Sequence, residues 1–322
     1  VDVFEEGHRV RVIPTDGEGL AKGAKLAAGR TRWKVHPETP ITVPLRHAWA
    51  TPVDLPYNGP MEEFARKRTR NDYTLMRLRQ MGIRHVRVPV SDLIDPQIRA
   101  RMEMFARTGI RFALFSLGVP DGAARALINA HRDLVTQLEV VGATDDLCDI
   151  AGDLDKLAEL GDLQIVVGKS HSSKHEPKQG SRFAHSVSSG FKWEARETVL
   201  EAVRALADFA RIDGLVMQIN LTDDLGSRLG EMDAFATASG LTIDANVRLA
   251  NPNPAIANFD DAAIARRVGE AVEAASSLTA VSVHIDTFVD VDRGYNPRHG
   301  LLDRHYNFRP AGRALATERT TS

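Results

Sequence analysis

The chain of 322 residues contains a single cysteine, Cys148, so these residues form no internal disulfide and no multi-cysteine zinc or iron–sulfur site. They also contain no apolar run near the roughly 18 residues that span a membrane. Lysine and arginine number 41 against 43 aspartates and glutamates, which excludes a broad attraction to nucleic acid or anionic lipid. We therefore expect no nucleic-acid or membrane partner, and the lone cysteine favours a reducing, cytoplasmic location.

Two kinds of segment alternate along most of the chain: short β-rich runs and longer amphipathic runs. The predicted strands are Leu45–Trp49, His85–Val90, Arg111–Leu117, Val135–Val141, Leu163–Val167, Gly214–Asn220, Leu241–Val247 and Ala280–Phe288. The predicted helices are Glu62–Met81, Asp95–Thr108, Glu197–Arg211, Ser227–Ser239 and Asp260–Ser277. Eight such units predict an α/β fold, a (β/α)8 TIM barrel, which typically takes about 250 residues. A doubly wound sheet is the alternative, but no G-x-G-x-x-G motif follows its first strand.

Residues 1–44 differ from the rest of the chain. Short alternating stretches, Val10–Ile13 and Arg32–Val35, are separated by glycine and proline. This pattern predicts an N-terminal β segment or appendage over 1–44 and the barrel over 45–322. Because TIM barrels carry their chemistry where strands end and loops begin, the candidate residues are those near the carboxyl ends of the predicted strands.

One stretch carries a family likeness. Gly82–Ser91 reads GIRHVRVPVS, which resembles the second strand of clan-A glycoside hydrolases of the cellulase and xylosidase type, written G-x-x-x-V-R-I-P-V-S. The chain end, Gly300–Arg304 followed by Asn307–Ala311, resembles the segment after the eighth strand of that clan. The resemblance implies a (β/α)8 barrel that acts on carbohydrate through glutamates on strands four and seven. Arg87 matches the arginine that supports the nucleophile there.

The chain departs from this pattern at both glutamates. Where strand four of the clan carries Asn-Glu, this sequence has Gly142 and Ala143, and Glu139 falls on an earlier, structural glutamate. On strand seven, Asp244 stands in the place of the nucleophile and is one methylene shorter. The resemblance therefore implies a divergent barrel with a non-standard carboxylate pair.

We predict Asp244 and Glu139 as the catalytic carboxylates and Arg87 as the residue that orients Asp244. The alternative for both carboxylates is a structural ion pair with arginine, because an unpaired charge inside a barrel is costly. Polar and aromatic residues near other strand ends are predicted to hold or stack on a sugar; they are Asn246, His284, Asp286, Trp49, His47 and Asn220.

The leading functional hypothesis is a soluble carbohydrate-active hydrolase of glycosidase type that acts on a small-molecule or oligosaccharide substrate with no metal or cofactor. One alternative is a catalytically degenerate barrel that binds a glycan or serves as a subunit. The other is a metal-dependent sugar isomerase or lyase, because His284, Asp286 and Asp290 lie close together in the sequence and are suitable ligands for a divalent cation.

Overall fold

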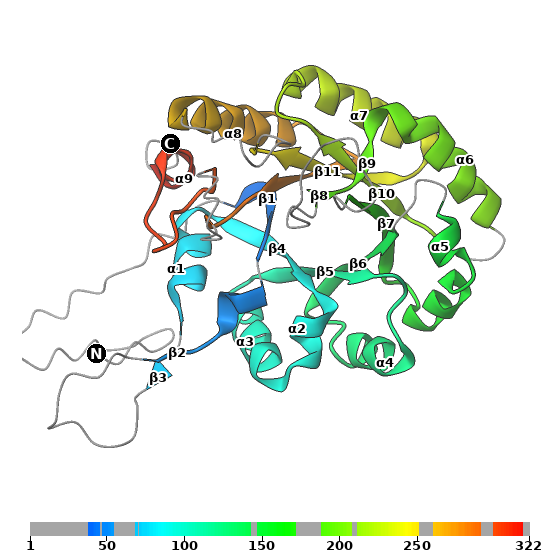
Figure 1. Ribbon diagram of the computed structural model, residues 1–322, viewed down its shortest axis with the longest axis horizontal. Helices are drawn as coiled ribbons and strands as arrows, with labels where there is room; N and C mark the ends of the chain where they lie inside the picture. Colours follow the sequence, from blue (N-terminus) through cyan, green and yellow to red (C-terminus); the bar gives the residue numbers. More distant parts are fainter. Residues whose placement is uncertain are drawn as a thin grey trace, which may run out of the picture. The chain divides into compact units, whose positions relative to one another are not determined.

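The computed structural model describes residues 38–45, 47–54, 68–69, 71–142, 147–171, 188–207, 211–250, 260–290 and 299–317. In this part of the chain, eight parallel strands form a closed barrel (Figure 1). Around the ring they are β1 (Thr39–Pro44), β4 (Ile83–Pro89), β5 (Arg111–Leu117), β6 (Val135–Gly142), β7 (Gln164–His171), β10 (Gly214–Ile219), β11 (Thr242–Arg248) and β12 (Val281–Asp286). The ring is closed because β12 pairs with β1 and β7 pairs with β10. The predicted (β/α)8 TIM barrel is confirmed.

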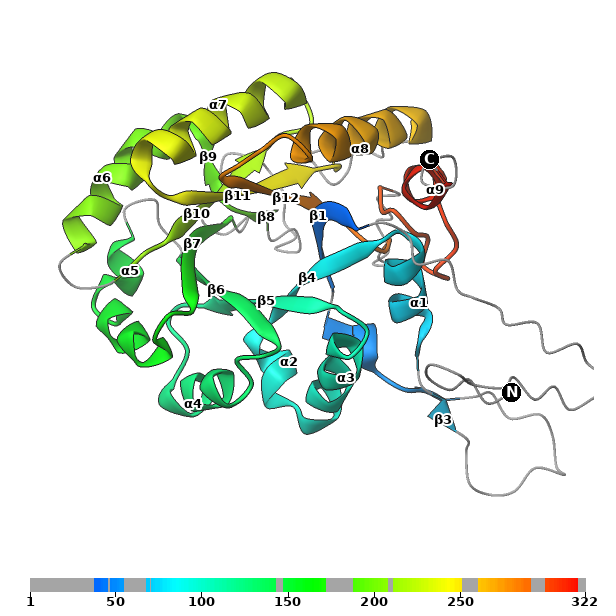
Figure 2. The same cartoon turned by 180° about the vertical axis from the view of Figure 1, so that it is seen from behind.

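Helices surround the barrel on its outside, as Figure 1 and, from behind, Figure 2 show. The α-helices are α1 (Tyr73–Gln80), α2 (Val90–Ile94), α3 (Pro96–Ala106), α4 (Gly122–Ala130), α5 (Cys148–Ala151), α6 (Arg196–Leu206), α7 (Leu225–Ser239), α8 (Asp261–Ala275) and α9 (Pro310–Thr317). Shorter elements are the 3-10 helices η1 (His47–Ala50), η2 (Leu154–Leu160) and η4 (Trp193–Ala195) and the strands β2 (Val53–Asp54), β3 (Arg68–Thr69), β8 (Ser188–Ser189) and β9 (Phe191–Lys192). Among the described helices, none has the length and apolar character needed to cross a membrane.

Aspartate side chains cap several helices at their first turn. The Asp95 carboxylate accepts a hydrogen bond from the backbone N–H of Gln97 at 2.8 Å, at the start of α3. Asp121 and Asp224 accept equivalent bonds at the starts of α4 and α7, both at 2.8 Å. Such caps satisfy amide groups that the helix itself leaves unpaired. They account for the start of α3 and of α7 within two residues of the predicted positions.

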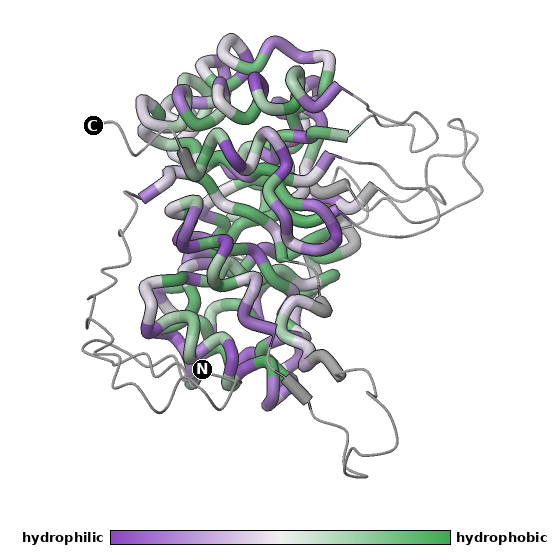
Figure 3. The backbone as a smooth tube through the Cα atoms, turned by 90° about the vertical axis from the view of Figure 1, so that its left-hand side faces the viewer, coloured by the Kyte–Doolittle hydropathy of each residue, from purple (hydrophilic) through white to green (hydrophobic). Residues whose placement is uncertain are grey.

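Side chains alternate between the two faces of each barrel strand. On β4 and β5 the outward residues Val86, Val88, Phe112 and Leu114 are fully buried against the helical layer. The helices alternate hydrophobic and hydrophilic positions along their length, as Figure 3 shows. Apolar packing therefore lies mainly between the strands and the helices, and the inward faces of the strands are left to carry polar groups.

The first barrel strand is Thr39–Pro44, so the prediction of a strand over Leu45–Trp49 is wrong. Residues His47–Ala50 instead form the helical turn η1. Two prolines, Pro40 and Pro44, obscure the strand in the sequence because proline lacks the N–H that a strand interior normally uses. The residue between them, Thr42, nevertheless pairs in parallel with both β4 and β12.

Parts of two other predictions fall outside the described residues. Of the predicted N-terminal β segment over 1–44, residues 1–37 are not described, and residues 39–44 belong to the barrel as β1. Of the predicted helix Glu62–Met81, the structure describes α1, which begins at Tyr73. A separate segment that precedes β1 therefore stays a prediction.

Candidate functional site

A layer of buried polar side chains lies inside the barrel. Glu139 on β6 is 1% exposed, and Asp244 on β11 is 2% exposed. The other members of this layer are Gln137, Gln218, Asn246 and His284, all of them buried. Each alternates along its strand with apolar residues that face the helices, so the period of two places all of them on the inward face. Both predicted carboxylates therefore lie in one polar layer.

Arg87 forms an ion pair with Glu139 inside this layer. Its Nε donates to Glu139 Oε2 at 2.5 Å, and its guanidinium lies 3.9 Å from the centre of the Phe115 ring. The strand order places β5 between β4 and β6, so the pair bridges over Phe115. We predicted that Arg87 orients Asp244, but its direct partner is Glu139, and Arg87 acts on Asp244 only through its charge.

Asp244 is held by an amide and an imidazole. Gln137 Nε2 donates to Asp244 Oδ2 at 2.5 Å, and His284 Nε2 lies 3.5 Å from Asp244 Oδ1. Burial by itself raises the pKa of Asp244, but His284, the hydrogen bond from Gln137 and the charge of Arg87 together outweigh it. The net effect holds the Asp244 pKa below its ordinary value of 3.8. Asp244 is therefore an ionised carboxylate at neutral pH.

Because the Asp244 pKa is lowered in the folded state, the free energy of unfolding depends on pH in the acid range. A carboxyl group with a depressed pKa in the folded state adds stability above its unfolded pKa, near 3.8, and loses it as pH falls through the lower folded value. As pH falls from about 6 to about 3, we expect the unfolding free energy of wild type to decrease more than that of Asp244→Asn, because only wild type carries this carboxyl group. Urea denaturation of both proteins across this range measures it. A difference independent of pH would contradict the assigned pKa direction.

Gly168 on β7 makes room for the Glu139 carboxylate. A Cβ atom at this glycine would lie 2.7 Å from Glu139 Oε1 and 3.3 Å from the side chain of Val216. The carboxylate is fully enclosed and held by Arg87, so it has little freedom to move aside. A glycine at this position is therefore a condition for the Arg87–Glu139 pair.

Gly168→Ala is expected to destabilise the protein by about 1–3 kcal/mol, because the added methyl overpacks the interior and displaces the carboxylate. Chemical denaturation measures this loss. The matched control is Gly230→Ala on α7, where the added Cβ meets no described atom within 4 Å beyond the neighbouring residues and the backbone of its own helix. Alanine is expected to stabilise the helix there by about 0.5–1 kcal/mol. If both variants were as stable as wild type or more so, the close approach at Gly168 would be refuted.

Three of the residues predicted to bind substrate gather at one side of the barrel. Asn246 on β11 stands opposite His284 on β12 in the strand register, and both are buried in the polar layer. Asp286, at the end of β12, is half-buried, stands opposite Arg248 and accepts a hydrogen bond from Thr287 Oγ1 at 2.6 Å. These groups form a polar wall that leads from the interior to the carboxyl ends of β11 and β12.

The three other predicted residues differ in what the structure shows of them. Trp49 is 3% exposed, donates from Nε1 to Asp92 at 2.8 Å and packs on Phe105 with ring centres 5.0 Å apart. It is part of the packing between barrel and helices, which is no position for stacking on a sugar. Asn220 follows β10, and its carbonyl accepts from the guanidinium of Arg267 at 2.6 Å. His47 begins η1, and its side chain lies outside the described part of the structure.

One residue of the hypothetical cation site, Asp290, has protein groups as its partners. Its carboxylate accepts hydrogen bonds from the backbone N–H of Gly300 at 2.7 Å and from Arg309 at 3.1 Å, and so links the chain after β12 to the segment before α9. Within the described ranges, no three His, Cys, Asp or Glu side chains are arranged to hold a metal ion. The metal-dependent alternative has no described ligand set to support it.

A cavity lies at the opposite end of the barrel from the polar wall. It measures about 420 Å³, and its lining includes Arg111 at the start of β5 and Leu134 just before β6, together with Glu103, Ala106, Arg107, His131 and Asp133. Strands begin at this face, whereas TIM barrels carry their chemistry at the face where strands end. We therefore place the candidate site in the polar layer and at the carboxyl ends of the strands.

The interior holds three residues that the sequence analysis did not include in the site, namely Gln137, Gln218 and Phe115. Gln137 shares a strand face with Glu139, and the alternation along β6 was sufficient to mark it as inward-facing. Phe115 was missed because an aromatic residue in a strand normally signals packing, and its contact with Arg87 depends on the pairing of β4 with β5.

The sequence matches no protein-family model and no curated protein. Solved structures of similar fold do exist. A family 39 glycoside hydrolase from the gut symbiont Bacteroides cellulosilyticus WH2 matches with a TM-score of 0.55 and 12% identity over 89% of this chain and 64% of that chain. A calcium-binding mutant of Bacteroides uniformis beta-glucuronidase 2 matches with a TM-score of 0.52 and 12% identity over 89% of this chain and 35% of that chain. This chain thus spans less than two thirds of either relative, and it shares with them a glycoside-hydrolase-like barrel fold.

Proposed function

We propose that this chain is a carbohydrate-active hydrolase of glycosidase type whose central carboxylate is Asp244. The observation that carries the proposal is an ionised aspartate enclosed in a glycoside-hydrolase-like barrel. Its described direct contacts are the Gln137 amide and the His284 imidazole. A negative charge held in this way stabilises the positive, oxocarbenium-like transition state of glycoside cleavage.

The roles follow from position. Asp244 either bonds to the anomeric carbon as the bond to the leaving oxygen breaks, and water then hydrolyses the glycosyl ester, or it takes a proton from a water that bonds to that carbon directly. In both cases the leaving oxygen takes a proton from solvent. Glu139 is the second carboxylate, and Arg87 holds it in place. Asn246, His284 and Asp286 line the side of the barrel where sugar hydroxyls bind, through hydrogen bonds of which those to Asp286 are charge-assisted. No cofactor enters this scheme.

A panel of nitrophenyl glycosides tests the proposal. It contains hexosides, pentosides and uronides in both anomeric forms, and release of nitrophenol is followed with wild type and with Asp244→Asn. We expect wild type to hydrolyse at least one member and the variant to hydrolyse none. Wild type that hydrolyses no member of the panel contradicts the proposal.

A glycan-binding barrel without turnover is the second candidate, and a specific observation favours it. Glu139 is enclosed and occupied by Arg87, which leaves it poorly placed to exchange a proton with a substrate. Calorimetry separates the two candidates, because this one requires a stoichiometric sugar complex with no hydrolysis in either wild type or Asp244→Asn.

A further inference from the structure

One wall of the barrel mouth is apolar. Leu117 ends β5 and is 73% exposed. Phe112 and Leu114 on the same strand are fully buried toward the helices, so the alternation places Phe115 and Leu117 on the inward face. The contact of Phe115 with Arg87, whose partner Glu139 lies inside the barrel, confirms this orientation. Such exposure of a leucine at the mouth of a barrel leaves an apolar surface in contact with water.

The opposite wall of the mouth is polar. In the ring order β5, β4, β1, β12, β11, the strand β11 stands four places from β5 in a ring of eight, which is diametrically across. Asn246 and Arg248 on β11 and His284 and Asp286 on β12 face inward there, in register with one another. A ligand that enters the barrel from this face meets hydrogen-bonding groups on one side and hydrocarbon on the other.

We propose that the site takes glycosides with an apolar aglycone, which Leu117 and Phe115 contact while the β11–β12 wall holds the sugar. This inference rests on the proposed function and names its substrate class. A sugar hydroxyl against Leu117 loses its hydrogen bonds to water without replacement, whereas an aryl or alkyl group there removes apolar surface from water on both sides. One face of the Phe115 ring already lies against the Arg87 guanidinium, so Leu117 supplies the larger part of the contact.

Paired non-hydrolysable ligands test this arrangement. Methyl and phenyl 1-thioglycosides of the same sugar, in a glucoside, xyloside and glucuronide series, are titrated into the full chain by calorimetry. We expect wild type to bind the phenyl member about tenfold more tightly than the methyl member. Leu117→Ser is expected to remove about tenfold of affinity for the phenyl ligand and less than about twofold for the methyl ligand. Because Leu117 is exposed, its replacement is expected to leave the fold intact, and the melting temperature of the variant verifies this.

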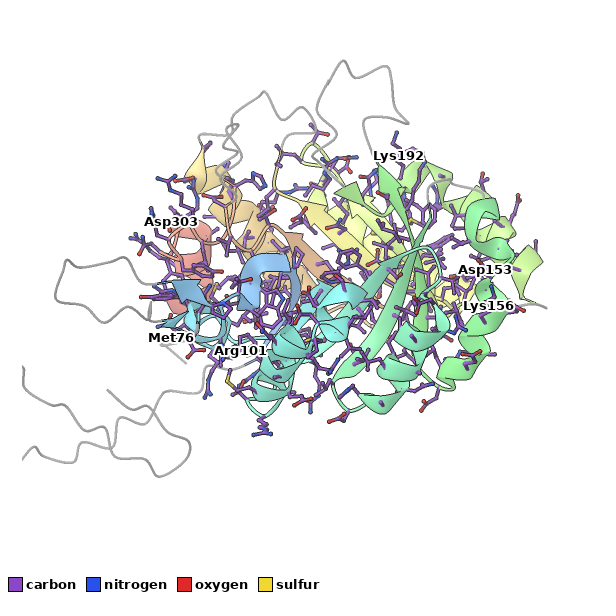
Figure 4. All side chains as sticks on the ribbon, turned by 60° about the horizontal axis from the view of Figure 1, so that its bottom comes forward. Met76, Arg101, Asp153, Lys156, Lys192 and Asp303 are labelled. Carbon is purple, nitrogen blue, oxygen red and sulfur yellow. The ribbon has the colours of Figure 1, made fainter. Side chains whose placement is uncertain are left out.

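Met76→Ser is the matched control, because it removes a second exposed apolar side chain, 42% exposed, from the outer helix α1. Lys192 pairs with the carboxyl-terminal part of β10 and so marks the face where the strands end. Figure 4 shows Met76 far from Lys192. This variant is expected to keep the phenyl preference of wild type. Loss of the preference in Met76→Ser would attribute it to general surface hydrophobicity and overturn the assignment to Leu117.

The outcomes separate this inference from the proposed function. Equal affinity of wild type for phenyl and methyl ligands, or an equal loss of both in Leu117→Ser, overturns the aglycone site and leaves the hydrolase proposal standing. Binding of neither ligand, together with no hydrolysis of any glycoside, overturns the proposed function and the aglycone site with it.

Discussion

Replacement of Asp244 by asparagine is expected to lower kcat for glycoside hydrolysis by about 1,000-fold or more, with the fold intact. The substitution keeps the shape of the side chain and an oxygen that accepts from Gln137, but it removes the charge that stabilises the transition state. Steady-state kinetics on the best nitrophenyl glycoside measure the effect, and circular dichroism verifies the fold.

The matched control is Asp286→Asn, which makes the same chemical change at the half-buried end of β12. Because Asp286 is proposed to hold a sugar hydroxyl, its loss is expected to raise KM by about tenfold and to change kcat much less. A fully active Asp244→Asn protein would remove Asp244 from the catalytic machinery. Equal kinetic effects of the two variants would show that only the loss of negative charge matters, and not its position.

Removal of Arg87 is expected to have the largest effect on stability. Arg87→Met leaves the Glu139 carboxylate enclosed without its cation, and such a loss costs about 3–5 kcal/mol. The double variant Arg87→Met/Glu139→Gln removes both charges and is expected to recover most of that loss, because a buried ion pair gains little over neutral groups of similar size. Urea denaturation at neutral pH gives the four free energies of this cycle.

Glu139→Gln alone is the informative single control. It leaves Arg87 with its side chain 15% exposed, so water relieves part of the lost interaction and the expected cost is smaller than that of Arg87→Met. An Arg87→Met protein within about 0.5 kcal/mol of wild type contradicts the ion pair as a structural element. Additive effects of the two substitutions, with no coupling energy, contradict it equally.

Most of the barrel could be predicted from local pattern. The run Arg111–Leu117 is rich in β-forming residues and forms β5 over the same residues. The strand β1 was missed because its signal is interrupted by Pro40 and Pro44, and the pairing that makes it a strand comes from β4 and β12, which are distant in the sequence. Local composition contains no information on such pairing.

The inward position of the two carboxylates was predictable, and their contacts were not. Period-two alternation was enough to place Glu139 and Asp244 on inward faces. Which carboxylate Arg87 meets depends on the stagger of neighbouring strands, and this is set by closure of the whole barrel. The sequence pattern predicts a strand that ends at Trp49 and so places its ring at the mouth. In the helical turn η1 the ring instead packs on Phe105, and its N–H donates to Asp92.

Hydrolysis itself is the most direct test of the account. Proton NMR of wild type incubated with the glycoside panel detects free sugar and released alcohol, and the anomer formed first reports whether configuration is retained. We expect free sugar with wild type and none with Asp244→Asn. A stoichiometric sugar complex of wild type that yields no free sugar would contradict it and identify the barrel as a binding protein.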